Sequence, residues 1–321
     1  MNRRSVSVLT LLALTALASP AAAQREEGAA VQGEEGAAAP MVLGVYAPWL
    51  YFPTSLARGQ YAEQLAGAVG RIAGLELRGR GFSAEGEFQE QIKSGQVAFA
   101  VVDAQYQIEK GLTALAQGIA EGRPTRTMVL VVRDGLDGGI ADLKGKTLAR
   151  VTVGPGDQAF ITNYLLQNQV EADYFARGRG VRDAQGALSL VKLGKADATF
   201  LYRGPAAGIF ESRPVPLPVV VQTRADLDPA VVTKVRQAIL GVTIRTDVID
   251  GFSAYRADVH EKLRGALRAA PTGPGNRPIY AQVREALPAV QPALELADKP
   301  PVVLPDIAPS MEAAAPPPDR F

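Results

Sequence analysis

Apolar residues in this chain form short runs that alternate with stretches in which apolar positions recur every three or four residues. The runs predict strands at residues 41–46, 75–78, 97–102, 127–133, 147–153, 174–176, 198–202 and 219–223. The helical spacing predicts helices through residues 61–72, 88–92, 140–143, 158–167 and 184–191. Asp228 as N-cap, with Pro229 at the first helical position, predicts a further helix over residues 229–241. Unbroken apolar runs are typical of parallel strands that are buried on both faces. The alternation therefore predicts an α/β protein whose sheets are mostly parallel and flanked by helices.

Two segments, roughly one domain length apart in the sequence, resemble each other. Residues 91–100 and 190–199 each read as a helix end, a glycine and a strand that begins directly afterwards. Gly95 and Gly194 stand where a left-handed residue ends a helix. The repetition favours two similar α/β lobes whose strands point into a shared cleft, although such junctions occur in any α/β fold.

The two ends of the chain differ in composition from its body. Residues 1–23 combine a basic start, an apolar stretch and small residues, which is the layout of a secretory signal peptide; the alternative is an uncleaved anchor. No cysteine follows this segment, so we expect no lipid anchor. Residues 24–40 predict a disordered linker, and the Pro/Ala-rich residues 291–321 predict a disordered tail. The folded body then covers about residues 41–290 of an exported, periplasmic protein.

Charge and residue usage narrow the possible functions. The chain has 34 Lys and Arg against 33 Asp and Glu, a balance that argues against a general nucleic-acid binder. Cysteine is absent, which excludes disulfide scaffolds, zinc-thiolate sites and cysteine nucleophiles. His260 is the single histidine, and its charged helical neighbourhood predicts a surface position. This composition removes most metal-dependent and nucleophilic enzymes but leaves the function open; we expect no catalytic residues, no metal and no cofactor.

Several segments, taken in order, resemble the type 2 periplasmic solute-binding proteins. A Val-rich strand that ends in Arg133 precedes Gly139–Ala149 (GIADLKGKTLA), which is similar to the xLADLKGKxVA segment of that family. The similarity continues at Lys192–Asp197 and at Thr223–Pro229. Val101–Tyr106 stands where the phosphate/phosphite/phosphonate-binding branch often has xGPxxY. The resemblance covers about residues 42–241.

The resemblance implies a two-lobed clamp. Residues 41–128 and 220–290 would form the first lobe and residues 129–219 the second, with residues 127–133 and 219–223 as the crossing hinge strands. The implied function is the solute-binding component of an ABC-type uptake system. Such a protein clamps a small polar, anionic ligand, phosphonate-like or a carboxylate, and delivers it to a membrane permease. We expect a monomer that performs no covalent chemistry and binds no nucleic acid.

The segment from Val153 to Phe160 is the most informative candidate for ligand contact. A strand enters a helix N-terminus here, so backbone N–H groups and the helix dipole can hold an anion, and Gly154 and Gly156 allow close approach. Members of the family with phosphonate-type ligands tend to have Ser/Thr-rich loops at this point. Here Asp157 and Gln158 replace the hydroxyl donors. Asp157 would repel a dianion unless it turns away as a helix cap, which is the structural alternative.

The remaining candidates follow the other strands of the predicted sheets. Each has a structural alternative: packing for the tyrosines and tryptophan, helix capping for the aspartate, and a solvated surface position for the arginine. The candidates are Tyr46, Trp49, Tyr51, Asp103, Tyr106, Tyr202 and Arg203. Rigid aromatic residues suit a cleft mouth, the carboxylate can accept from an ammonium group, and the guanidinium can form a bidentate contact with a carboxylate or phosphonate.

Three other functions remain open. A receptor of the TRAP-associated (TAXI) type would deliver its solute to a different permease. A periplasmic sensor or assembly module would use its tail to contact a membrane partner. An enzyme on the same fold, of the menaquinone-pathway type, would use cleft carboxylates such as Asp103 or Asp157; the predicted signal peptide argues against it.

Overall fold

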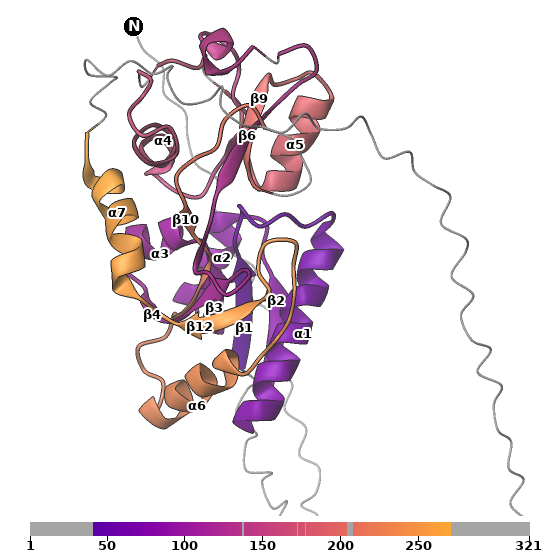
Figure 1. Cartoon of the computed structure of the whole chain (residues 1–321). Helices are drawn as coiled ribbons and strands as arrows, with labels where there is room; N and C mark the ends of the chain where they lie inside the picture. The colour runs from indigo at the N-terminus through magenta and orange to yellow at the C-terminus, as the bar shows by residue number, and fades with distance from the viewer. Residues whose placement is uncertain (1–40, 137, 172, 177, 204–207, 271–321) are drawn as a thin grey trace, which may run out of the picture. The chain divides into compact units, whose positions relative to one another are not determined.

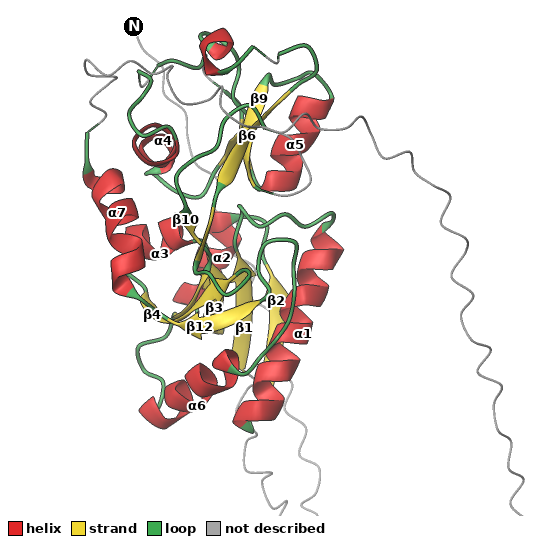
Figure 2. Ribbon diagram, viewed as in Figure 1, coloured by secondary structure: helices red, strands yellow, loops and turns green. Residues whose placement is uncertain are grey.

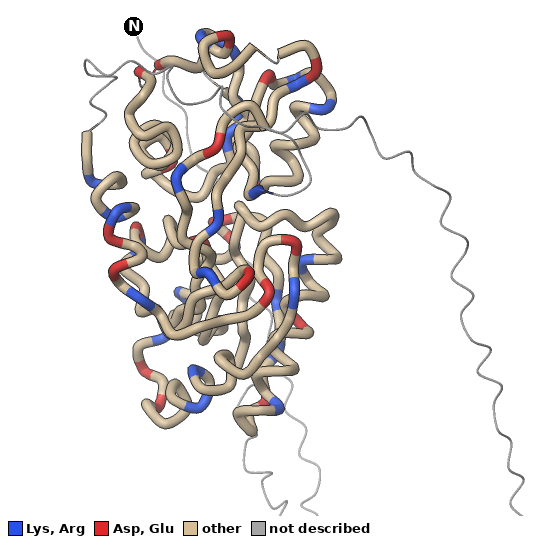
Figure 3. Tube along the Cα trace, in the orientation of Figure 1, with Lys and Arg blue, Asp and Glu red and all other residues tan. Residues whose placement is uncertain are grey.

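The computed structural model of the chain describes residues 41–136, 138–171, 173–176, 178–203 and 208–270. The predicted signal peptide, linker and tail lie outside the described residues, as do residues 271–290 of the expected first lobe. Charges of both signs are interspersed along the described chain (Figure 3), in keeping with the balanced composition.

A six-stranded sheet carries the larger part of the fold (Figures 1 and 2). Its order is β12-β4-β11-β3-β1-β2. The strands are β1 (Met41–Tyr46), β2 (Leu77–Gly81), β3 (Val97–Val102), β4 (Thr113–Ile119), β11 (Val219–Gln222) and β12 (Gly251–Ala254). Strand β1 pairs in parallel with β2 and β3, whereas the pairs β3–β11, β11–β4 and β4–β12 are antiparallel.

The sheet is therefore mixed, and not mostly parallel as the sequence pattern predicts. The apolar run of β11 is buried along most of its length, so its pattern is the same for either strand direction. Strand β4 is missing from the sequence prediction because its polar Thr113 and Gln117 interrupt the apolar pattern.

Helices α1 (Ser55–Ala73), α2 (Glu85–Lys93), α3 (Ala104–Lys110), α6 (Pro229–Leu240) and α7 (Ala257–Arg268) accompany this sheet (Figure 2). The Thr54 hydroxyl accepts from the Ala57 N–H at the start of α1, and Gly74 ends that helix in the left-handed conformation. Asp228 caps α6 by accepting from the Ala230 N–H, with Pro229 at the first helical position, as the sequence predicts.

A second, smaller group of strands lies between β4 and β11 in the sequence. Strand β6 (Met128–Val132) pairs antiparallel with β9 (Ala198–Tyr202), and β7 (Arg150–Val151) pairs in parallel with β8 (Gly180–Val181). The accompanying helical elements are η1 (Ile140–Leu143), α4 (Asp157–Ala159), the π-helix η2 (Phe160–Leu165) and α5 (Ala184–Lys192).

The chain crosses between the two strand groups through a short antiparallel pair, β5 (Thr125–Arg126) with β10 (Val215–Pro216) (Figure 1). The expected crossing strands at residues 127–133 and 219–223 belong mainly to the sheets themselves, as β6 and β11. The chain therefore crosses a few residues before each of the predicted runs. The sequence pattern does not reveal this position, because a two-residue strand is too short to form an apolar run. Helix α7 also contacts both groups, through α3 and η2.

The glycine turns that the sequence repeats are present. Gly95 and Gly194 have φ angles of 71° and 63° and follow α2 and α5, just before β3 and β9. The expected surface position of His260 is wrong: its side chain is buried beside Tyr255, with the ring centroids 4.7 Å apart. Burial lowers the pKa of His260, which disfavours the charged imidazolium.

The two faces of β6 and β9 pack against different apolar clusters. Met128 and Leu130 belong to the main core, whereas the alternate residues Val129 and Val131 form a small separate cluster with Leu201. Ala184 and Leu188 of α5 complete this cluster. The outer face of the smaller sheet is therefore apolar as well.

Close packing of α1 on β2 generates a stability prediction. A Cβ at Gly79 would overlap the backbone of Ala62, so Gly79→Ala is expected to lower the free energy of unfolding by about 1–3 kcal/mol. In Gly67→Ala the new methyl on α1 meets only the far end of Arg71, and the change should stabilise by about 0.5–1 kcal/mol. Urea denaturation of both variants measures the difference, and equal effects would contradict this packing.

Candidate functional site

The loop after β1 joins the two strand groups. The N–H of Trp49 donates to Oδ2 of Asp103 over 3.1 Å, which holds the loop against the end of β3. One residue earlier, the carbonyl oxygen of Pro48 accepts from the N–H of Ala184, the first residue of α5, over 2.9 Å. The loop is thus fixed on one side to the large sheet and on the other to the helix of the small one.

A buried ion pair forms a second link between these parts. Arg58 of α1 contacts Asp183 through Nη2 and Oδ2 over 2.8 Å, and its side chain is 3% exposed. The guanidinium also donates to Ser83 Oγ over 2.7 Å. The other carboxylate oxygen of Asp183 accepts from the Gly186 N–H over 2.9 Å and caps α5.

The sequence reasoning missed both residues of this pair. Asp183 precedes a predicted helix, so it carried a capping signal. Arg58 carried a weaker signal: it shares the helical spacing of the buried residues Tyr61 and Leu65 on α1, where a charged residue requires a partner.

Asp103 is a buried carboxylate at the end of β3, 2% exposed. It occupies the N-cap position of α3, but its side chain makes no capping hydrogen bond and accepts from Trp49 instead. Its Oδ1 atom has no hydrogen-bond partner within the described part of the chain. Burial raises the pKa of Asp103 to about 7, although the Trp49 N–H and the charge of Arg58 act in the opposite direction.

Asp157 caps its own turn. Its Oδ1 accepts from the N–H groups of Val153 and Gly154 over 3.1 and 3.0 Å, and from the Gln105 side-chain amide over 2.7 Å. The same amide donates to Oε1 of Glu109 over 2.8 Å. Burial raises the pKa values of both Asp157 and Glu109. The turn that could hold an anion therefore already contacts two carboxylates of the chain itself.

Glu109 explains why this turn contains glycine. A Cβ at either Gly154 or Gly156 would overlap the Glu109 carboxylate. The N–H of Gly156 also acts as a hydrogen-bond donor that lowers the pKa of Glu109, against the larger effect of burial. The two glycines allow Glu109 of α3 to approach the backbone of the smaller strand group closely.

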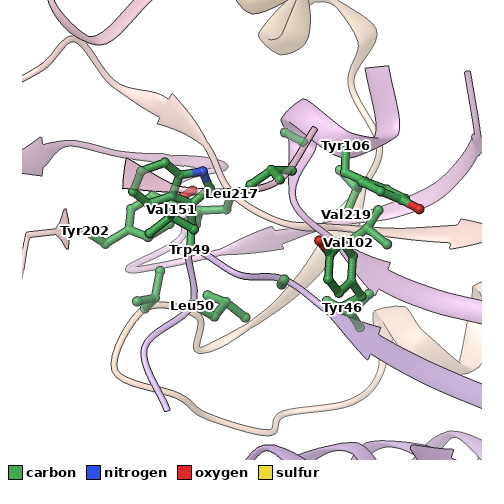
Figure 4. Packing of buried hydrophobic residues seen from close by; sticks show 14 of the residues in the cluster. Tyr46, Trp49, Leu50, Val102, Tyr106, Val151, Tyr202, Leu217 and Val219 are labelled. Atoms are coloured by element: carbon green, nitrogen blue, oxygen red, sulfur yellow. The ribbon is translucent and has the colours of Figure 1, made fainter. Parts of the chain in front are cut away.

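The aromatic candidates divide into two groups (Figure 4). Tyr46 packs with Tyr106 at a centroid distance of 5.1 Å, and the Gln89 amide donates to the Tyr106 hydroxyl over 2.8 Å. Both tyrosines are enclosed in the core of the large sheet. Trp49 packs on Phe160 at 5.6 Å and, with Tyr202, faces a cavity.

That cavity has a volume of about 790 Å³. The first strand group contributes Trp49, Tyr51, Asp247 and Val248. The second strand group contributes Val131, Val132, Arg133, Asp134, Leu188, Val191, Lys192, Leu193, Gly194, Leu201, Tyr202 and Arg203. Its wall includes the outer apolar face of β6 and β9, and charged residues of both signs lie along it. The cavity is of a size typical for small-molecule sites.

The structure therefore distributes the predicted ligand residues over three environments. Trp49, Tyr51, Tyr202 and Arg203 line the cavity. Asp103, Gly154, Gly156 and Asp157 lie in the polar contacts described above, and Tyr46 and Tyr106 are packed in the core. Gln158 accepts from Arg150 Nη1 over 3.3 Å, and Arg203 forms an exposed ion pair with Glu211 over 2.7 Å. A ligand role for each of these residues remains a prediction.

The described residues also bear on other classes of function. They contain no group of three or more His, Cys, Asp or Glu side chains that could hold a metal ion. Among the helices that the structure describes, none has the length and apolar character needed to cross a membrane.

Comparison with known proteins places the fold. No family model matches the sequence, and no curated protein matches it. Among solved structures, the binding-protein component of an ABC phosphonate transporter from Pseudomonas aeruginosa superposes with a TM-score of 0.57 at 15% identity, covering 71% of this chain and 85% of that one. PhnD1 of Prochlorococcus marinus, solved with methylphosphonate, gives a TM-score of 0.56 at 12% identity over 70% and 96% of the two chains. A Xanthomonas citri protein solved with ATP gives 0.51 at 16% identity over 71% and 95%.

This chain has the two-lobed fold of the type 2 periplasmic binding proteins. The fold class that the sequence predicts is thereby confirmed, with the sheet mixed as described. At these identities the likeness concerns the fold alone, and the ligand depends on the chain's own lining residues.

The ion pair between the two strand groups generates a stability prediction. Asp183→Asn keeps a capping oxygen for α5 but leaves the Arg58 charge buried without its partner. We expect the free energy of unfolding to fall by about 2–4 kcal/mol, a discounted value because Asp183 is 22% exposed. The matched change Asp226→Asn removes an exposed partner of Arg224 and should have a much smaller effect on stability. Chemical denaturation that gives equal losses would contradict the buried pair.

The raised pKa of Asp103 generates a pH prediction. A carboxyl whose pKa is higher in the folded than in the unfolded protein stabilises the fold when protonated, and this contribution is lost as the pH rises from about 4 through about 7. Asp103→Asn keeps an oxygen for the Trp49 N–H and removes the ionisation. The stability of the variant relative to the native protein should therefore increase over that range, by at most about 4 kcal/mol.

Chemical denaturation at a series of pH values measures this difference. Glu109 and His260 also titrate but are common to both proteins, so the difference reports on Asp103 together with its electrostatic interaction with Asp157. Asp173→Asn, at an exposed position, is the control and should run parallel to the native protein. A native curve parallel to that of Asp103→Asn would show that Asp103 does not titrate in this range.

Proposed function

We propose that this chain is the extracytoplasmic solute-binding component of an ABC-type uptake system. The observation that carries the proposal is the cavity of about 790 Å³, which residues from both strand groups line. Trp49 and Tyr51 approach it from the large sheet, and Leu188 and Tyr202 approach it from the small one. A solute in this cavity would contact both parts of the molecule at once.

Contacts on both sides of a cavity couple binding to conformation. A ligand that touches both strand groups favours the arrangement in which they are close. The resulting shift in free energy equals the difference between the ligand's binding free energies for the two arrangements. The Arg58–Asp183 pair and the Ala184–Pro48 hydrogen bond belong to that close arrangement. The membrane permease would then recognise the closed, loaded protein.

Binding without turnover is also supported by the position of the carboxylates. Asp103 and Asp157, which an enzyme on this fold would use, have raised pKa values but neither lines the cavity. An acid or base has to lie within hydrogen-bond reach of the reacting group. The two carboxylates expected to serve an enzyme thus lie outside the cavity lining, which supports a receptor.

The partner and the location complete the proposal. The fold is shared with the binding component of an ABC phosphonate transporter, which supports an ABC permease as partner and the periplasm as location. Copurification of the chain with a coexpressed ABC permease tests this choice, and retention only by a TRAP-type permease or by a sensor kinase would overturn it.

A melting screen tests the binding role. Phosphate, phosphite, methylphosphonate, sulfonates, carboxylates and amino acids are each added to the folded protein, and thermal unfolding is followed. A bound solute at a concentration of about 100 times its dissociation constant should stabilise the protein by about 2.7 kcal/mol. The same solute should stabilise Lys234→Ala, an exposed change on α6 outside the cavity lining, to the same extent. A folded protein whose stability no small solute changes would contradict the proposed function.

A further inference from the structure

The backbone N–H donors of the turn at Val153–Asp157 already make hydrogen bonds to carboxylates of the chain itself. Its N–H groups at Val153 and Gly154 donate to Asp157, and the Gln105 amide bridges Asp157 and Glu109. The N–H of Gly156 faces Glu109. A phosphonate or phosphate at this turn would have to displace two carboxylates from their hydrogen bonds, and would meet their like charges when they ionise.

The cavity offers a different chemistry. Its wall includes Val131, Leu201 and Leu188 of the small apolar cluster, and Trp49 and Tyr51 face it from the other strand group. Leu193, which follows α5, is 67% exposed and belongs to the same lining. A large apolar side chain exposed beside an apolar wall is a feature of ligand-binding surfaces.

The volume of the cavity and the charges on its lining also favour a ligand that packs against this apolar wall. A space of about 790 Å³ suits a drug-sized molecule, whereas methylphosphonate would leave most of it to water. The charged lining is mixed: Lys192 has no ion-pair partner among the described residues, and Asp134 and Asp247 lie on the same lining. A polar head of either sign, or a zwitterion, would find a partner there.

We infer that the ligand of this site carries an apolar body of about aromatic size, packed against Trp49, Tyr51 and the Leu188–Leu193 end of α5, with its polar head towards the charged lining. This inference rests on the proposed function and names its solute class. It differs from a small phosphonate held at Val153–Asp157, because that turn binds the chain's own carboxylates.

The single tryptophan makes the test direct. Trp49 is the only tryptophan of the chain and lines the cavity, so tryptophan emission reports on a residue of this lining and on no other tryptophan. The probes are 3-phenylpropionate, 3-phenylpropylamine and phenylalanine, with methylphosphonate and inorganic phosphate as the small-anion arm. At least one apolar-bodied probe should change the emission of Trp49 in a saturable manner, and the small anions should not.

Variants localise the binding. Leu193→Glu places a charge on the apolar lining at an exposed position where folding is not at risk, and should weaken binding of the apolar-bodied probe at least tenfold. Leu240→Glu changes an exposed leucine of α6 outside the cavity and should leave the affinity unchanged. Circular dichroism confirms that both variants fold.

The outcomes separate this inference from the proposed function. The inference is overturned if no apolar-bodied probe binds, if binding leaves Trp49 emission unchanged, or if Leu193→Glu binds as the native protein does. Binding of methylphosphonate or phosphate alone would overturn the inference and leave the receptor function standing. A melting screen without any effective solute would remove the receptor function itself.

Discussion

The hydrogen bond from the Trp49 N–H to Asp103 is the contact on which the arrangement of the site depends. It holds the loop after β1 at the end of β3, and the same loop accepts from α5 through Pro48 and presents Trp49 and Tyr51 to the cavity. The contact places the Asp103 carboxyl in a buried position, where burial raises its pKa and disfavours its charged form. Holding the loop in this position therefore costs free energy for burying the Asp103 charge. The Trp49 N–H and the charge of Arg58 offset part of that cost.

Burial also raises the pKa values of Asp157 and Glu109, and the hydrogen bonds that hold these two carboxylates limit which ligands the site can bind. Both carboxylates are held by donors that an anionic ligand would otherwise use. Type 2 binding proteins need contacts from both lobes to favour closure. In this chain the polar turn makes such contacts between its own residues, whereas the cavity lining includes Val131, Leu201 and Leu188 of the small apolar cluster. One fold can in this way serve ligands of different chemistry, because the ligand depends on the lining side chains.

Much of the fold could be predicted from the sequence, because several strands and helices carry strong local sequence signals at the residues where they form. Met41–Tyr46 and Val97–Val102 are strands over the predicted residues, and Asp228 with Pro229 begins α6 as expected. Strand direction, the short crossing pair β5–β10 and the burial of His260 depend on contacts between distant residues, which leave no local pattern. The site was predictable only in part: strand ends pointed to Trp49 and Tyr202, but nothing local shows that Glu109 fills the turn at Gly154 or that Arg58 pairs with Asp183.

A solute held between the two strand groups should draw them together. The chain has no cysteine, so Lys195→Cys after α5 and Lys234→Cys on α6 would accept spin labels at two exposed positions only. Pulsed electron–electron double resonance then measures the distance between the two labels with and without a solute that stabilises the protein. A clamp that closes on its solute should give a broad distribution that becomes narrower and shifts when the solute is added. Identical distributions in both conditions, at a saturating solute concentration, would contradict it.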